Sequence, residues 1–143
     1  MKIYLSGGMT GLPQYNFPEF HRQAKLLRDM GHAVFNPAED CCGNPLDPDL
    51  EYSKEEIQEF FRHDLRCIAM SEALVMIDGW QYSLGANVEV LAAKLCGIKI
   101  MRLSEDLMGA MLFEINETNV IDLAVRAIIR VMRGGLEKQE ALS

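Results

Sequence analysis

Basic residues are scarce in this sequence. Only 14 lysines and arginines stand against 21 aspartates and glutamates, which gives a formal net charge of −7. Nonspecific binding to nucleic acid needs clustered basic side chains, because these neutralise the phosphate backbone. The charge balance therefore argues against a nucleic-acid partner. A small anionic ligand stays open, since it needs only a few hydrogen-bond donors.

Patterned cysteines are also missing. Cys41, Cys42, Cys67 and Cys96 form no Cys-x-x-Cys pair, and none has a histidine at zinc-finger spacing. The adjacent Cys41 and Cys42 cannot easily meet the geometry of a disulfide. We expect four reduced thiols, no metal site, no cofactor and a cytoplasmic location.

Long apolar runs and linkers are absent as well. No stretch approaches the roughly 20 apolar residues that cross a bilayer, and residues 1–5 are too short for the apolar part of a signal peptide. The sequence has no internal repeat or low-complexity tract. We therefore expect no membrane partner, a single domain over residues 1–134 and a frayed tail over 135–143.

What the chain does contain is an alternation of short apolar strands and amphipathic helices. Strands are expected at 2–6, 33–35, 73–77 and 98–101, and a fifth short strand is left open at 110–115. Helices are expected at 17–30, 53–68, 88–96 and 118–132. Gly134 and Gly135 are expected to end the last helix. Strands that alternate with helices predict an α/β fold, with a parallel sheet of four or five strands covered on both faces.

One stretch organises the chemistry. Residues 83–89 (Ser-Leu-Gly-Ala-Asn-Val-Glu) join the apolar strand at 73–77 to an Ala-rich helix. A helix N-terminus after a parallel strand suits an anion and favours the ionised form of a nearby carboxylate such as Glu89. The alternative interpretation is that Glu89 only complements the helix dipole on the surface.

Parallel strands bring the loops that follow them to one edge of the sheet. Tyr4, Ser6, Gly7 and Gly8 are thereby expected near Ser83, Gly85 and Glu89, within reach of Asp64 from the helix before the strand at 73–77. Paired carboxylates are the usual equipment for cleaving a glycosidic bond. Gly85 and Glu89 are four helical residues apart, a rise of about 6 Å, which suits the span from a 5′-phosphate to the anomeric carbon of a nucleotide.

At this point the sequence resembles the nucleoside 2-deoxyribosyltransferase superfamily, and in particular its small phage and bacterial members. The resemblance covers residues 2–102, and its motifs lie at 2–11, 15–18, 35–39, 62–65, 72–75 and 83–89. The last motif is similar to the nucleophile motif of 2′-deoxynucleoside 5′-monophosphate N-hydrolases. The resemblance implies a flavodoxin- or Rossmann-like three-layer sandwich and a homodimer or larger homo-oligomer.

The resemblance also implies roles for individual residues. Glu89 would be the nucleophile on the deoxyribose anomeric carbon, Asp64 its partner near the base or the attacking water, and Tyr4 the group that orients Glu89. The expected contacts with a small deoxynucleoside or deoxynucleotide are Ser6, Gly7, Gly8, Thr10, Ser83, Gly85 and the loop aromatic Trp80.

Two departures from the family pattern bear on the reaction. Ser83 stands where the transferases have an aspartate, which favours hydrolysis over base exchange. Thr10 stands where the nucleotide hydrolases have an arginine, which leaves the phosphate without its usual partner unless Arg62 or Arg66 replaces it. The expected activity is cleavage of the N-glycosidic bond of a 2′-deoxynucleoside or its 5′-monophosphate, by hydrolysis or deoxyribosyl transfer. A non-catalytic nucleotide-binding module and an NAD- or cyclic-nucleotide-cleaving glycosidase are the alternatives.

Overall fold

A five-stranded sheet forms the centre of the molecule. The computed structural model describes the backbone of residues 1–115 and 117–142 and the side chains of residues 1–115 and 120–134. The strands are β1 (Lys2–Ser6), β2 (Ala33–Phe35), β3 (Ala73–Met76), β4 (Lys99–Asp106) and β5 (Gly109–Glu114). They lie in the order β2-β1-β3-β4-β5, which is the flavodoxin-like order.

The fifth strand departs from the purely parallel sheet that the sequence predicts. β1 to β4 are parallel, whereas β5 folds back on β4 and pairs with it antiparallel, from Met101 opposite Glu114 to Asp106 opposite Gly109. The connection between the two strands is too short to hold a crossover helix, so only a hairpin is possible. The three-layer α/β prediction is confirmed, with a mostly parallel, mixed sheet.

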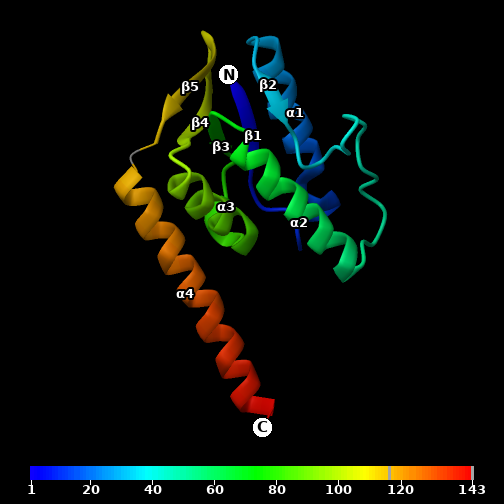
Figure 1. Ribbon diagram of the computed structural model, residues 1–143, viewed down its shortest axis with the longest axis vertical. Coiled ribbons are helices and arrows are strands. Elements are labelled where there is room, and N and C mark those ends of the chain that lie inside the picture. Colours follow the sequence, from blue (N-terminus) through cyan, green and yellow to red (C-terminus); the bar gives the residue numbers. More distant parts are fainter. Residues whose placement is uncertain (116, 143) are drawn as a thin grey trace.

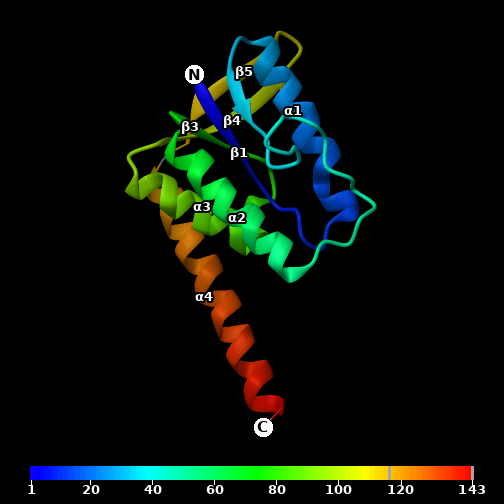
Figure 2. The same ribbon diagram turned by 45° about the vertical axis from the view of Figure 1, so that its right-hand side comes forward.

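Helices cover both faces of this sheet (Figures 1 and 2). They are α1 (Phe17–Asp29), α2 (Lys54–Ala69), α3 (Leu84–Leu95) and α4 (Glu117–Leu142). α1 packs on one face, and α2, α3 and α4 contribute to the core on the other. The alternation of side chains along β1 divides it between the faces: Ile3 and Leu5 pack with α1, and Tyr4 packs toward α2 and α3.

A capping box begins α2. The Ser53 hydroxyl accepts a hydrogen bond from the Glu56 amide at 3.1 Å, and the Glu56 carboxylate accepts one from the Ser53 amide at 2.7 Å. Between β2 and α2 the chain forms a long loop, in which an isolated bridge joins Glu39 to Pro45.

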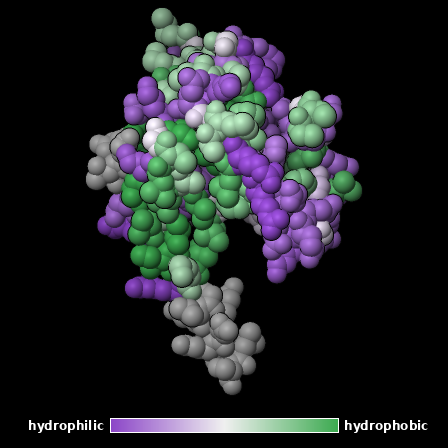
Figure 3. Space-filling view, in the orientation of Figure 1, coloured by the Kyte–Doolittle hydropathy of each residue, from purple (hydrophilic) through white to green (hydrophobic). Residues whose placement is uncertain are grey.

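α4 is longer than expected. It continues through Gly134 and Gly135 to Leu142, so these glycines do not end the helix, and Figure 1 shows it extending beyond the rest of the chain. Val120 and Ala124 are buried against the body. Leu123, Val125, Ile129, Val131 and Met132 are exposed, and Figure 3 shows an apolar surface over this helix. The single-domain boundary and the homo-oligomer stay predictions.

The structure bears on two further expectations, which concern the cysteines and membrane-spanning helices. Cys41, Cys42, Cys67 and Cys96 are all free cysteines. None of the helices in the described part of the chain is long and apolar enough to span a membrane.

The topology places a crevice at one edge of the sheet. From β1 the chain moves outward to β2, then returns to β3 on the other side of β1 and continues to β4. Ligands of open α/β sheets bind at such a reversal of strand order, outside the carboxyl ends of the strands. The ends of β1 and β3 therefore mark the place where a site is expected.

Candidate active site

Glu89 is buried at the reversal point, in the second turn of α3. Only 6% of the Glu89 surface is exposed to solvent. The start of α3 is held in place by Asn87, whose side-chain amide donates to the carbonyl oxygens of Gln81 and Ser83 at 3.1 and 2.6 Å. The Ser83 hydroxyl caps the helix by accepting a hydrogen bond from the Ala86 amide at 3.2 Å. These contacts fix the direction in which α3 presents Glu89.

β1 supplies two polar side chains that face Glu89. Tyr4 and Ser6 are two residues apart, so they project from the same face of the strand. The Ser6 hydroxyl donates to Glu89 Oε1 at 3.0 Å, and Ser6 itself is fully buried. Tyr4, also buried, lines the same pocket as Glu89 and Asp64, and both carboxyl groups raise the pKa of its hydroxyl. The sequence-based expectation that Tyr4, Glu89 and Asp64 come together is therefore met by the geometry.

Burial controls the ionisation of this cluster. Loss of solvation raises the pKa of Glu89 to about 8, an effect that the nearby Asp64 increases and that hydrogen bonds from Tyr4 and Ser6 oppose. Burial likewise raises the pKa of Asp64 to about 7, against a hydrogen bond from Tyr4. The Tyr4 pKa is raised well above its usual value by burial and then by the two carboxylates. Perturbed titrating groups that share a cleft are typical of functional sites.

The cluster opens into a pocket of about 420 Å³, hereafter the candidate pocket. It is lined by Tyr4, Gly7, Met9, Thr10, Pro37, Ile57, Phe61, Asp64, Tyr82, Ser83, Leu84, Gly85, Ala86 and Glu89. In the space-filling view, a notch separates the apolar surface over α4 from the polar surface over the exposed end of α2 (Figure 3). A pocket of this volume is in the range of small-molecule sites.

Most of the predicted contact residues line this pocket, and three do not. Gly7, Thr10, Ser83 and Gly85 are among its lining residues. Gly8 lines a neighbouring cavity instead. Ser6 is buried behind Glu89, where its hydroxyl holds that carboxyl group; it is placed to position Glu89 and not to touch a ligand.

Trp80 requires a correction. Its indole is 5% exposed and packs in the core between the sheet and the α2–α3 side, so it does not face the candidate pocket as a stacking residue would. Its neighbour Tyr82 is 86% exposed and lines the pocket. A short 3₁₀ turn over Trp80–Tyr82 separates the two rings in this way.

Ile57 and Phe61 are pocket residues that the sequence pattern did not reveal. They recur at helical spacing with Phe60, Leu65 and Ile68, a pattern that predicts a buried stripe along α2. In the structure Ile57 is 45% exposed, and both side chains line the candidate pocket. The N-terminal half of α2 extends past the sheet edge (Figure 1), and an apolar stripe on such an overhang faces a cleft and not a core.

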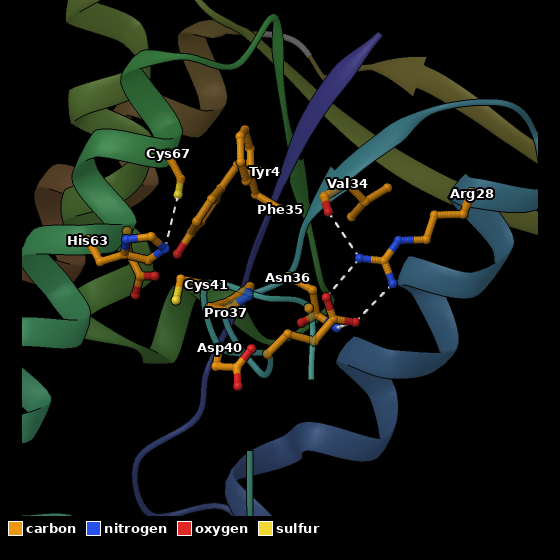
Figure 4. Close-up of a pocket in the computed structure, with 13 residues that line it drawn as sticks. Tyr4, Arg28, Val34, Phe35, Asn36, Pro37, Asp40, Cys41, His63 and Cys67 are labelled. Atoms are coloured by element: carbon orange, nitrogen blue, oxygen red, sulfur yellow. Dashed lines mark hydrogen bonds and ion pairs between the residues drawn. The ribbon is translucent and has the colours of Figure 1, made fainter. Parts of the chain in front are cut away.

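A second cavity, of about 220 Å³, adjoins the candidate pocket and shares Tyr4, Pro37 and Asp64 with it. Figure 4 shows His63 and Cys67 of α2 on one side of this cavity, with His63 Nε2 3.4 Å from the Cys67 sulfur. Burial and the charge of Asp64 raise the pKa of the Cys67 thiol, so this pair is not an activated nucleophile. Asp64 is thus accessible from two sides.

Arg28 of α1 reaches the opposite side of the second cavity (Figure 4). Its guanidinium donates to both carboxylate oxygens of Glu39 at 2.8 Å each and to the Val34 carbonyl at 3.0 Å. Hydrogen bonds to Glu39 raise the pKa of Arg28. This arginine is therefore engaged in closing the edge of the sheet beside β2.

Among the described residues, no three His, Cys, Asp or Glu side chains are grouped as a metal ion would need. The chemistry available to the site is that of two buried carboxyl groups, a phenol and a hydroxyl. Such a set can attack, orient and move protons without a redox group.

The fold and this site together define a class: doubly wound α/β proteins with a pocket lined by two carboxyl groups at the reversal of strand order. Within that class, the chain belongs to the family described as a domain of unknown function (DUF4406), whose model matches residues 1–102. Among solved structures, it is similar to the 2-deoxyribosyltransferase of the psychrotolerant bacterium Bacillus psychrosaccharolyticus, with 28% identity, a TM-score of 0.53 and 71% of each chain covered. This similarity confirms the nucleoside 2-deoxyribosyltransferase-like fold. No curated protein matches the chain.

Proposed function

We propose that this chain is an N-glycosidase or deoxyribosyltransferase that acts on a 2′-deoxynucleoside or its 5′-monophosphate. The observation that carries the proposal is the convergence of Glu89, Asp64 and Tyr4 on one pocket at the carboxyl edge of the sheet. The similarity to a 2-deoxyribosyltransferase, an enzyme described as a biocatalyst for the synthesis of nucleosides, supports the same reaction class.

In the proposed first step, the ionised Glu89 carboxylate attacks the anomeric carbon of the sugar. A carbon–oxygen bond forms there while the bond to the base nitrogen breaks, and its electron pair leaves with the base. Protonated Asp64 donates its proton to the departing base, which leaves Asp64 ionised. Tyr4 orients both carboxyl groups through its hydroxyl.

In the proposed second step, an acceptor attacks the same carbon and releases Glu89. Water as the acceptor gives free deoxyribose, and a second base gives a new nucleoside; in either case Asp64 takes up the proton that the acceptor loses. The substitution of Ser83 for the aspartate of the transferases favours water. The covalent intermediate makes both outcomes available to one site.

Chromatography of released base tests this function. Purified protein is incubated with the four common deoxynucleosides and their 5′-monophosphates, with and without a second free base. We expect free base from at least one substrate, and loss of at least a thousandfold in rate for Glu89→Gln, which keeps the size of the side chain and removes its nucleophilic charge.

The matched control is Glu114→Gln, an exposed glutamate on β5 outside the candidate pocket. Equal release of base by wild type and Glu89→Gln would refute the role of Glu89. Saturable ligand binding without release of base in any of the reactions would instead identify a binding module. Release of nicotinamide from NAD, with none of the deoxynucleosides cleaved, would point to the glycosidase alternative.

A further inference from the structure

A cavity of about 90 Å³, hereafter the aromatic cavity, adjoins the candidate pocket on the side of the long loop. The two spaces share four lining residues, which are Met9, Thr10, Pro37 and Ile57. The remaining lining residues of the aromatic cavity are Tyr15, Phe17, Leu46, Tyr52 and Phe60. They belong to the start of α1 and the turn before it, the long loop and α2, and Figure 2 shows the loop passing the start of α1 on its way to α2. The aromatic cavity is therefore a side branch of the candidate pocket.

Four aromatic rings give the aromatic cavity its apolar surface. The ring centroid of Tyr15 lies 5.4 Å from that of Phe17 and 5.6 Å from that of Tyr52, and those of Tyr52 and Phe60 are 5.3 Å apart. Both tyrosine hydroxyls donate to backbone carbonyls of the long loop, at 2.8 and 2.7 Å. Because the hydroxyls are engaged there, the tyrosines offer the cavity mainly ring carbon atoms. None of the described residues that line it has a charged side chain.

Two observations distinguish the aromatic cavity from an ordinary packing gap. Ile57 and Phe60 are 45% and 36% exposed, so part of its wall is apolar surface that the core does not cover. Tyr15 has a φ of 53° and stands between two other non-glycine residues with positive φ. Backbone strain of this kind costs free energy and is typical of segments that hold a ligand. An apolar space that offers water few partners suits an apolar group of a ligand.

One face of α2 gives the direction in which a ligand reaches this space. Ile57, Phe61 and Asp64 lie at positions i, i+4 and i+7, so they share a face of the helix, and all three line the candidate pocket. Ile57 and Asp64 are about 10 Å apart along the helix axis. Ser83 and Glu89, on the α3 side of the candidate pocket, do not line the aromatic cavity. A nucleoside with its sugar at Glu89 and its base beside Asp64 therefore directs the far edge of the base along Phe61 toward the aromatic cavity.

We propose that the aromatic cavity is a specificity subsite for a short alkyl substituent on the base of the substrate. This inference rests on the proposed function and adds a determinant that lies outside the sugar and the reacting bond. The volume of about 90 Å³ holds about three groups of the size of a water molecule, at about 30 Å³ each. A chain of about three carbon atoms fills it. Because burial of each methylene favours binding about fourfold, we expect such a chain to be preferred at least tenfold over hydrogen.

Two homologous series of substrates test the subsite. 2′-Deoxyuridine carries hydrogen, methyl, ethyl, propyl or hexyl on carbon 5 of its base, and 2′-deoxyadenosine carries the same groups on its exocyclic amine. Release of base is measured as kcat/KM for each nucleoside and its 5′-monophosphate. We expect kcat/KM in at least one series to rise at least tenfold from hydrogen to propyl and to fall at hexyl, which exceeds the cavity. A flat or falling dependence in both series, with base released from the unsubstituted substrates, would overturn the inference and leave the proposed function intact.

A polar substituent of similar size separates an apolar subsite from mere space. The 5-ethyl and 5-hydroxymethyl derivatives of 2′-deoxyuridine are nearly equal in volume. We expect the ethyl derivative to be preferred at least tenfold, because a hydrophobic pocket disfavours a hydroxyl group that finds no free partner. Equal or better use of the hydroxymethyl derivative would refute the apolar assignment.

Binding provides a readout that does not depend on turnover. The thermal shift of the wild-type protein is recorded with the two propyl derivatives and with their unsubstituted parents at equal concentrations. A larger stabilisation by a propyl derivative supports the inference even if no base is released from any substrate, in which case only the proposed function fails. Equal or smaller stabilisation by both propyl derivatives refutes the inference.

Leu46 allows opposite changes of volume at one position. It lines the aromatic cavity and not the candidate pocket, and it belongs to the long loop and is partly exposed. Leu46→Phe should fill the cavity and remove the preference for propyl over hydrogen, whereas Leu46→Ala should enlarge it and shift the preference toward hexyl. Leu107→Phe, at the exposed tip of the β4–β5 hairpin, is the matched control and should keep the wild-type preference. The same chain-length preference in all three variants would contradict the assignment of the subsite.

Discussion

The buried Glu89 carboxyl group imposes a pH-dependent cost on the folded state. Its pKa rises from 4.5 to about 8 on folding, chiefly through burial. Between these pH values the folded protein holds a proton that the unfolded chain has released, so this group's contribution to stability falls as pH rises. At 1.36 kcal/mol per pH unit, the whole interval is worth about 5 kcal/mol. Local rearrangement and water entry around the carboxylate reduce this, and we expect about 2 to 5 kcal/mol.

Glu89→Gln removes the titrating group while keeping an oxygen that can accept from Ser6. We expect wild type and variant to have similar free energies of unfolding near pH 5, and the variant to be the more stable by that amount near pH 9. Trp80, the single tryptophan of the chain, is buried in the core, so its fluorescence reports urea unfolding at each pH. Glu114→Gln, on the surface, should follow wild type throughout.

If Glu89 is buried, the curves of stability against pH must differ between wild type and Glu89→Gln. If the Glu89→Gln curve of stability against pH runs parallel to that of wild type from pH 5 to 9, the carboxylate is not desolvated in the folded protein. The raised pKa, and with it the mechanism that depends on a buried nucleophile, would then have to be abandoned.

Three further substitutions test neighbouring parts of the site. Ser6→Ala removes the hydrogen bond that favours ionised Glu89. The acidic limb of the pH–rate profile should therefore move up by about one pH unit, while KM changes little. An unmoved limb would exclude a positioning role for Ser6. Tyr4→Phe should lower kcat by about 10- to 100-fold, and wild-type kcat would exclude Tyr4 from orienting the carboxyl groups. Gly7→Ala brings a Cβ within 2.9 Å of Ile77 Cβ and should destabilise the fold by about 1–3 kcal/mol in urea unfolding, an effect that an unchanged midpoint would refute.

The alternation of strands with helices and the meeting of the two carboxylates could be predicted because they depend on regular patterns. The apolar run at 73–77 and the helix after it identify a buried parallel strand and a crossover. Parallel strands then bring Tyr4 and Glu89 to one edge whatever the details of the loops. The direction of β5 was not predictable in this way, because its pattern is compatible with either a crossover or a hairpin partner.

The turn before α1 lies beyond pattern-based reasoning. Gln14, Tyr15 and Asn16 all have positive φ angles, of 52°, 53° and 59°, although none of them is glycine. Distant contacts hold them there. The side-chain amide of Asn16 donates to the Gly8 carbonyl at 3.2 Å, and the Tyr15 hydroxyl donates to the Leu50 carbonyl at 2.8 Å. A local propensity cannot reveal a conformation that the long loop and the β1 loop impose together.

The sequence interpretation missed some of the pocket residues for a related reason. Helical periodicity identifies which side chains share a face, as it did for Ile57 and Phe61, but it does not show where the covering sheet ends. Trp80 shows the converse case, because a large aromatic residue in a loop near a site can be needed to fill the core. Whether an apolar residue lines a pocket or packs in the core depends on whether its helix or loop extends past the sheet in the folded protein.

Burial and hydrogen bonding together decide where the carboxyl pair holds its proton. The Tyr4 hydroxyl has a single proton, so it can donate to Glu89 or to Asp64 but not fully to both. Ser6 donates only to Glu89, which gives that carboxylate up to two donors when Tyr4 also turns toward it. Because the two groups interact, their pKa values of about 7 and about 8 describe the pair. Ser6 lowers the pKa of Glu89 but leaves it above that of Asp64, so the singly protonated pair holds its proton mainly on Glu89, and the proposed attack requires that proton to move to Asp64.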